Sequence, residues 1–296
     1  MASDTVSVAA AFEAAAAEGR AAFVPYITTG FPTAESTVEL LQALEAGGAD
    51  IIEVRKSRAT GNAATLAPRH TAATLPGLRI PPPVQLGVPF SDPLADGPTI
   101  QAANQRALMG GASVHTALEA VAAARAAGVK VPIILMGYLN PFLSHNAEGD
   151  VAQFVAAAAA AGAQGFIVVD LPPDEPPAKA WLSACAEHKL CFVPLVAPTT
   201  TDARLGEVAA AVGDAAAYVY CVSIAGVTGA RTDLPDHLPA FISRVASAFP
   251  SSPLVVGAAG AVVGSAVVKA ADKAHAEGGD AGKAVKELVQ HLTSLK

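Results

Sequence analysis

Short apolar runs rich in valine, isoleucine and leucine alternate along the chain with longer, alanine-rich stretches of helical period. Continuous apolar strands separated by helices are typical of a parallel sheet that is covered on both faces. The predicted strands are Phe23–Thr28, Asp50–Val54, Ile133–Tyr138, Phe166–Asp170, Phe192–Ala197, Tyr218–Ser223, Leu254–Gly257 and Ala261–Val263. The main predicted helices are Thr37–Ala46, His115–Ala127, Asp150–Ala161, Pro177–His188, Asp202–Val212 and Leu238–Ala248. Eight strands in 296 residues predict an α/β fold, a (β/α)8 TIM barrel that forms one domain over residues 1–296.

A doubly wound parallel sheet is the alternative architecture. It is disfavoured because no Gly-x-Gly-x-x-Gly motif opens a helix after the first predicted strand. In a barrel the loops after the strands hold the chemistry. We therefore expect the active site at the C-terminal ends of the strands, where this sequence places most of its polar residues.

The run from Leu86 to Pro98 is the most informative of these loops. It carries two carboxylates, Asp92 and Asp96, among prolines, which fix φ, and glycines, which permit φ > 0, so we expect a rigid shaped loop. A rigid loop holds a carboxylate in place, as acid–base chemistry requires. The same two carboxylates could instead cap the helical pattern that opens at Thr99.

A second candidate site follows the last predicted strand. Gly264 and Ser265 stand directly before a helical pattern, and the free N–H groups at a helix N-terminus attract anions. Barrels commonly bind phosphate after strands seven and eight, and Gly226 and Gly229 would let a second backbone segment approach the same anion. Ordinary capping by Ser265 is the alternative, but the position in the barrel favours a phosphate site.

Composition narrows the class of protein. Apolar residues make up 52% of the chain and charged residues 15%, which is ample material for a core. The net charge of −7 argues against nucleic acid as a partner. Cys185, Cys191 and Cys221 have no CxxC spacing, which predicts buried thiols in a reducing compartment. Polar residues and glycine interrupt the uncharged windows 151–169 and 245–268, so we expect a soluble protein with no membrane span. We also expect no signal or transit peptide.

Five motifs occur in the order seen in one enzyme family. They are Phe23–Pro32, Leu86–Gln101, Asp170-Leu171-Pro172, Gly226-Val227-Thr228-Gly229 and Gly264-Ser265-Ala266. On these motifs the chain resembles tryptophan synthase alpha chains. The resemblance implies a lyase of L-tryptophan biosynthesis that cleaves indole-3-glycerol phosphate to indole and glyceraldehyde 3-phosphate. It also implies a beta-chain partner, no cofactor and no metal.

The resemblance assigns roles to individual residues. The family's catalytic glutamate ends strand two in a run reading Ile-Ile-Glu-Leu-Gly-Val-Pro-Phe-Ser-Asp, so Glu53 inherits the role of proton donor and acceptor. Such a role suits a carboxyl of raised pKa in an apolar pocket. Asp96 matches the aspartate that pairs with the indole N–H and stabilises developing positive charge, and Tyr220 matches a tyrosine near the glycerol chain. The remaining residues expected to bind substrate are Gly226, Thr228, Gly229, Gly264 and Ser265.

The chain departs from the family in two places. Residues 54–85 separate Glu53 from Leu86, which are neighbours in the family run; this segment is basic and proline-rich, and we expect a disordered insertion. Its in-frame length and its terminal valine and glutamine fit a translated intron. At the second place, which we call the seam, Gly257 and Gly260 are too close in sequence to hold the helix and loop expected between strands seven and eight. We expect these two strands to fuse, or one of them to leave the sheet.

Three other interpretations stay open. A stand-alone indole-3-glycerol phosphate lyase would carry the same motifs and release indole without a beta chain. A catalytically impaired barrel would serve only as a beta-chain partner, and the short seam after Gly257 favours that possibility. Nucleic-acid binding through the basic segment is the weakest of the three, because the segment lacks interleaved aromatic residues. The expected compartment is the plastid stroma for a plant or alga and otherwise the cytoplasm.

Overall fold

The computed structural model describes residues 5–19, 22, 24–48, 84–222, 237–257 and 262–294. Its elements, in chain order, are α1 (Val8–Ala17), β1 (Tyr26–Thr28), α2 (Ser36–Ala46), β2 (Val84–Gly87), α3 (Pro98–Met109), α4 (Val114–Ala126), β3 (Ile133–Gly137), α5 (Leu139–Leu143), α6 (Val151–Ala161), β4 (Gly165–Val168), α7 (Ala178–His188), β5 (Cys191–Phe192), β6 (Leu195–Val196), α8 (Asp202–Val212), the 3-10 turn η1 (Gly213–Ala215), β7 (Val219–Val222), α9 (Leu238–Ala248), β8 (Leu254–Gly257), α10 (Val262–Ala276) and α11 (Ala281–Ser294).

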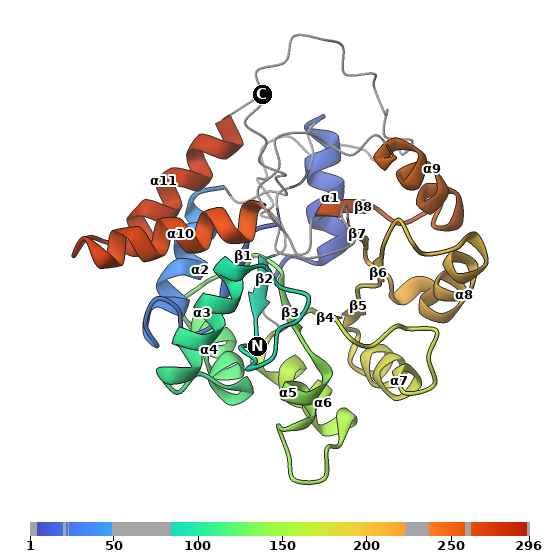
Figure 1. Cartoon of the computed structure of the whole chain (residues 1–296), viewed down its shortest axis with the longest axis horizontal. Coiled ribbons are helices and arrows are strands. Elements are labelled where there is room, and N and C mark those ends of the chain that lie inside the picture. The colour runs from blue at the N-terminus through green and yellow to red at the C-terminus, as the bar shows by residue number, and fades with distance from the viewer. Residues whose placement is uncertain are drawn as a thin grey trace.

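The strands are parallel throughout the described part of the chain. They form two sheets there, with the orders β1-β2-β3-β4-β5 and β6-β7-β8. β2 lies between β1 and β3 in a register that places Gln85 opposite both Tyr26 and Ile134. The helices surround the strands on the outside (Figure 1). The arrangement is that of a (β/α)8 barrel, as the sequence predicts.

Polar caps set the ends of several helices. Asp150 precedes α6, and its carboxylate accepts a hydrogen bond from the backbone N–H of Ala152 at 2.8 Å. Ser113 and Thr116 form a capping box at the start of α4. α6 ends at Gly162, whose φ of 97° lies in the left-handed region that favours glycine. These caps provide partners for backbone groups that a helix leaves unpaired at its ends.

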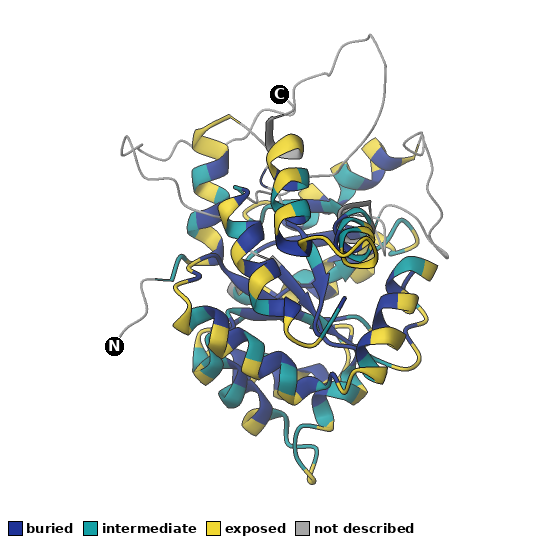
Figure 2. Ribbon diagram, turned by 90° about the vertical axis from the view of Figure 1, so that its left-hand side faces the viewer, coloured by how far each residue is buried: buried dark blue, intermediate teal, exposed yellow. Residues whose placement is uncertain are grey.

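Two hydrophobic layers follow from the alternation of side chains along the strands. Leu135 and Phe166 face outwards into the layer between strands and helices. Their neighbours face the inner layer, which is enclosed by the strands; its buried members are Val8, Ile134, Ile167, Val193, Tyr218, Tyr220 and Val255. Buried residues accordingly lie on the strands and on the helix faces turned towards them (Figure 2).

Helix α1 covers the amino-terminal end of the inner layer. The ring of Phe12 lies 5.3 Å from that of Tyr218. The side-chain amide of Gln164, just before β4, donates to the Val6 carbonyl at 2.8 Å, and the Val6 N–H donates to the Lys130 carbonyl before β3. With this end covered, the carboxyl ends of the strands are the open side available for chemistry.

Three strand predictions need correction or fall outside the structure. The predicted strand Phe192–Ala197 is two short strands, β5 and β6, with Pro194, which has no N–H to donate to a ladder, between them. The predicted strand Asp50–Val54 lies outside the described residues, and β2 fills the place between β1 and β3. The predicted strand Ala261–Val263 is wrong, because Val262 and Val263 begin α10.

The start of α10 shows how the chain resolves the short seam. A crossover between parallel neighbours needs about a dozen residues or more, and the chain from Gly257 to Val262 is shorter than that. Helix α10 instead packs against β1 and α3. One of the two outcomes expected at the seam is therefore confirmed: the last predicted strand leaves the sheet. In the described residues no ladder joins β8 to β1.

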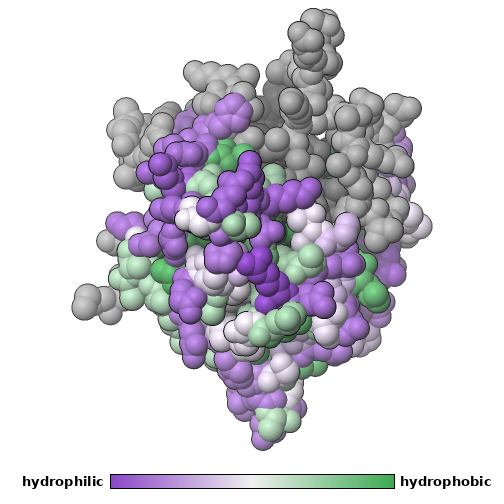
Figure 3. All heavy atoms as spheres, turned by 60° about the vertical axis from the view of Figure 1, so that its left-hand side comes forward, coloured by the Kyte–Doolittle hydropathy of each residue, from purple (hydrophilic) through white to green (hydrophobic). Residues whose placement is uncertain are grey.

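Three observations describe the helices, the possible metal ligands and the surface of the described part of the chain. Within the described residues no helix has both the length and the apolar character needed to cross a membrane. The same part of the chain holds no group of three or more His, Cys, Asp or Glu residues placed to bind a metal ion. In the described part of the face shown in Figure 3, hydrophilic residues predominate and hydrophobic residues form small separate patches.

Candidate active site

Asp96 lies in the loop that joins β2 to α3, residues 88–97, at the carboxyl ends of the strands. We call this loop the acidic loop. The loop is held by its own backbone: the N–H of Asp96 donates to the Pro93 carbonyl at 3.0 Å, and the N–H of Leu94 donates to the Asp92 carbonyl at 2.9 Å. The side-chain amide of Gln101, in the first turn of α3, donates to the Asp96 carbonyl at 2.9 Å. Asp96 is thus fixed at both its own N–H and its carbonyl, as predicted for a rigid loop.

The Asp96 carboxyl is buried and contacts the hydroxyl of a tyrosine. The residue is 8% exposed, and the Tyr138 hydroxyl, which follows β3, donates to Oδ2 at 3.4 Å. The same hydroxyl accepts the Ala95 N–H at 2.9 Å, so Tyr138 ties the loop to the end of β3. Burial raises the pKa of Asp96 to about 6, and the Tyr138 hydrogen bond opposes that rise. The carboxyl is therefore mainly ionised at neutral pH but costly to keep charged.

Tyr26 of β1 lies beside the same loop. Its hydroxyl covers Gly87 so closely that any side chain at position 87 would collide with it. Thr28 donates to that hydroxyl at 3.4 Å. Burial, and next the charge of Asp96, raise the pKa of Tyr26. The tyrosine is therefore un-ionised and lies within electrostatic reach of Asp96.

Gln85 is a buried polar residue of the inner layer. It is 4% exposed, and its side-chain amide donates to the Tyr218 hydroxyl at 3.3 Å. Burial raises the pKa of Tyr218 and the hydrogen bond from Gln85 opposes that rise. Tyr220, two residues further along, is also buried and faces the inner layer from β7, opposite Leu195 and Val255. Tyr220 thus faces the barrel interior, and its contact with the glycerol chain stays a prediction.

The other predicted site residues are placed differently or lie outside the described part of the chain. Glu53 is outside it, and so are the substrate-binding candidates Gly226, Thr228 and Gly229. Gly264 and Ser265 are in the first turn of α10. The prediction that they directly precede the helix is wrong, because α10 starts at Val262.

Sequence reasoning missed three residues of this region, Gln85, Tyr26 and Tyr138, as members of the site. Tyr138 could have been found from its place at the end of a predicted strand, next to the conspicuous acidic loop. Tyr26 and Gln85 gave no such signal. Their inward orientation depends on the strand register, which the sequence pattern placed at residues 50–54 for the second strand.

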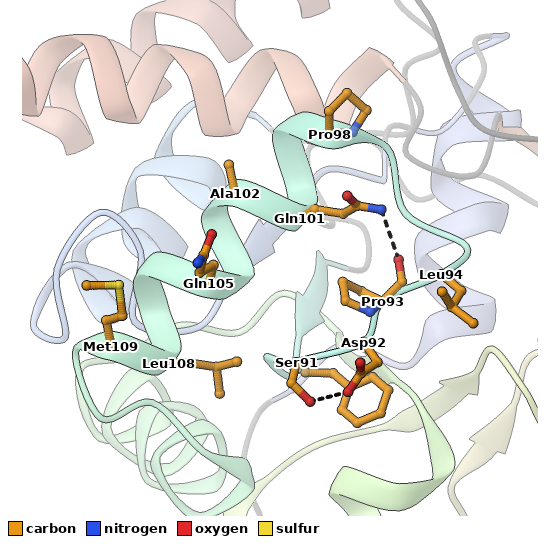
Figure 4. Close-up of a pocket in the computed structure, with 11 residues that line it drawn as sticks. Ser91, Asp92, Pro93, Leu94, Pro98, Gln101, Ala102, Gln105, Leu108 and Met109 are labelled. Atoms are coloured by element: carbon orange, nitrogen blue, oxygen red, sulfur yellow. Dashed lines mark hydrogen bonds between the residues drawn. The ribbon is translucent and has the colours of Figure 1, made fainter.

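A groove of about 880 Å3 lies on the outer side of the acidic loop. Its lining residues come from the loop and from one side of α3 (Figure 4): Phe90, Ser91, Asp92, Pro93, Leu94, Pro98, Gln101, Ala102, Gln105, Leu108 and Met109. Leu94 and Met109 are 85% and 83% exposed. Asp96 does not line this groove, so the groove and the buried carboxyl are separate features of one loop.

Comparison with known proteins identifies relatives over most of the chain. The model of the family described as "Tryptophan synthase alpha chain" matches residues 12–55 and 82–295. The residues between these two matches fall inside the predicted insertion 54–85. A tryptophan synthase alpha chain from Roseiflexus sp. (strain RS-1) is 39% identical over 304 residues, which cover 98% of this chain and 98% of the relative.

Solved structures show the same architecture. Tryptophan synthase from Mycobacterium tuberculosis, in space group F222, aligns with a TM-score of 0.73 and 30% identity over 98% of each chain. A tryptophan synthase alpha chain from Legionella pneumophila subsp. pneumophila aligns with a TM-score of 0.70 and 28% identity, over 95% of this chain and 94% of that one.

Proposed function

The chain belongs to the family of tryptophan synthase alpha chains, which are lyases, and we propose that its barrel cleaves indole-3-glycerol phosphate to indole and glyceraldehyde 3-phosphate. The observation that carries the proposal is Asp96: a buried carboxyl of raised pKa, held rigidly at the carboxyl ends of the strands. A carboxylate in that setting suits an indole N–H whose nitrogen becomes positively charged during the reaction.

The cleavage needs two proton movements and no redox chemistry. A proton is added to the ring carbon that carries the side chain, and the hydroxyl on the adjoining side-chain carbon loses one. The bond between these two carbons breaks, its electron pair stays with the ring, and the hydroxyl carbon becomes the aldehyde. Asp96 accepts the ring N–H and offsets the positive charge. The proton donor and acceptor is a second carboxyl, assigned by the resemblance to Glu53.

The phosphate end of the substrate would bind at the start of α10. Gly264 and Ser265 belong to the first turn, in which the N–H groups up to that of Gly264 have no acceptor within the helix and favour an anion. Gly226, Thr228 and Gly229 complete the proposed phosphate contacts, and Tyr220 would contact the glycerol chain from β7. The proposal requires no cofactor and no metal.

We also propose that the active polypeptide is one alpha subunit of a complex with a beta chain. Relatives that align over nearly the whole of this chain are named as tryptophan synthase, including an aminoacrylate-bound form from M. tuberculosis. A stand-alone lyase is the second candidate, and co-purification of the chain with a beta chain discriminates between the two. Residues 54–85 are proposed to be absent from the active form. The family model resumes at residue 82 and leaves 56–81 unmatched, which supports that proposal.

Indole release from indole-3-glycerol phosphate by a repaired chain tests the function. The repaired chain lacks residues 54–85 and carries, after Gly257, an inserted helix and loop of about a dozen residues or more, as a parallel crossover requires. We expect turnover without added cofactor, and its loss in the matched Glu53→Gln variant with substrate binding retained, because an amide does not transfer the proton. Failure of the repaired chain to release indole, with and without a beta chain, would contradict the proposed function.

A further inference from the structure

Gln85 fills the place in the sheet that the family run gives to its glutamate. The residues that follow it, Leu86 to Phe90, are those that follow the glutamate in that run. β2 is hydrogen-bonded to β1 on one side and to β3 on the other, with Gln85 opposite Tyr26 and Ile134. Only one residue of β2 can lie opposite both Tyr26 and Ile134, and that residue is Gln85.

The side chain of Gln85 points into the barrel. Leu86 belongs to the outer layer, so Gln85 and Gly87, its neighbours in the strand, face inwards. The hydrogen bond from Gln85 to the Tyr218 hydroxyl at 3.3 Å fixes this orientation. Gly87, one pleat nearer the carboxyl end, lies under the Tyr26 hydroxyl. The charge of Asp96 contributes to the raised pKa of Tyr26, after burial. Gln85 therefore lies in the barrel interior one pleat below Gly87, and Asp96 lies in the loop that follows the same strand.

We propose that position 85 is the proton-transfer position of this barrel and that the full chain holds an amide there in place of a carboxyl. The inference rests on the proposed function and on the register of β2. A carboxyl alternates between its acid and its base, so it can deliver a proton to the ring carbon and take one from the hydroxyl. The Gln85 amide has N–H donors and a carbonyl acceptor but does neither near neutral pH. Within the described residues, position 85 of this barrel therefore carries no acid–base group.

Installing the carboxyl tests the proposal by a gain of activity. Indole release is measured for the full chain, its Gln85→Glu variant, its Glu53→Gln variant and the double variant, and for the chain lacking 54–85, in which Glu53 directly precedes Leu86. We expect no release by the full chain above a blank, and release by Gln85→Glu at least about 10²-fold above that blank. The chain lacking 54–85 should match Gln85→Glu.

The same set of chains is measured again with the crossover inserted after Gly257. An absence of indole release in this second set is then not caused by the seam. Indole release by the full chain that is lost on Glu53→Gln would overturn the proposal. Activity of the chain lacking 54–85 without activity of Gln85→Glu would also overturn it and leave the proposed function standing. Absence of indole release by every chain, the repaired one included, would contradict the proposed function itself.

A second measurement checks that the introduced carboxyl lies inside the barrel. Among the residues that the structure describes, the titratable groups around position 85 are Tyr26 from β1, Tyr218 before β7, Tyr220 from β7 and Cys191 from β5, with Asp96 beyond Tyr26. None of these supplies a positive charge. Relative to the full chain, Gln85→Glu should therefore unfold at lower urea concentration at pH 8 than at pH 5. An equal difference at both pH values would place residue 85 in water and overturn the assignment.

Discussion

Replacing Asp96 by asparagine should stabilise the folded barrel above neutral pH. Burial raises the pKa of the Asp96 carboxyl from 3.8 to about 6, so the folded state holds this proton more tightly than the unfolded state does. Below a pH of about 4 both states are protonated and the carboxyl costs nothing. As the pH rises through 4 to 6, the unfolded state ionises first and the folded state loses stability.

The size of the effect follows from the pKa difference. One pKa unit corresponds to about 1.4 kcal/mol, so a shift of about two units costs about 3 kcal/mol once both states are ionised. The asparagine side chain of the variant would be neutral at every pH and could still accept the Tyr138 hydrogen bond. An unpaired amide N–H in the variant would lower its stability equally at all pH values. The difference in unfolding free energy between variant and parent should therefore rise by about 2.5 kcal/mol between pH 4 and pH 8.

Urea unfolding followed by circular dichroism at several pH values measures this difference. Asp92→Asn is the matched control, because Asp92 lies on the same loop but is exposed, where water screens its charge. Its difference from the parent should be small. A difference for Asp96→Asn that stays flat from pH 4 to pH 8, or falls, would refute the view that this carboxylate is buried without a stabilising charge.

Three other substitutions test the surroundings of the site and the frame that holds it. Tyr138→Phe removes the hydroxyl that donates to Asp96 and accepts from Ala95; it should cost about 1 kcal/mol and move the pH dependence described for Asp96 to higher pH, and an unchanged pH dependence would contradict the contact. Gly87→Ala places a methyl group against the Tyr26 hydroxyl and should cost about 1–3 kcal/mol in urea unfolding, whereas a neutral result would show that Tyr26 is free to move. Arg125→Met removes a part-buried guanidinium that donates to the backbone carbonyls of Gly162, Val129 and Val131; we expect a loss of about 2–4 kcal/mol, and equal stability of the variant would contradict a structural role.

The overall architecture could be predicted because its signals are local. β-branched runs and alanine-rich periods mark most strands and helices within a few residues, and caps such as Asp150 and Gly162 are visible in the sequence. The acidic loop was also predictable, since proline fixes φ at several of its positions and glycine permits tight turns. Its function-relevant property was not: the raised pKa of Asp96 arises from burial beneath distant segments, including Tyr138.

The second strand shows where sequence patterns are insufficient. Residues 51–53 and residues 84–86 are both compatible with a short buried strand, and only pairing with β1 and β3 decides between them. The seam after Gly257 is a similar case. Val262 and Val263 look like strand residues, but a helix forms there because the chain is too short to reach a parallel neighbour. Long-range geometry, rather than local preference, determined both outcomes.

Indole formation from indole-3-glycerol phosphate at pH 8, by the repaired chain and by the same chain with Asp96→Asn, tests the central claim most directly. The repaired chain should turn over the substrate, and the variant should be slower by a factor on the order of 10² or more, although it should be the more stable protein at that pH. Equal rates for the two chains would show that the buried carboxylate has no part in the reaction.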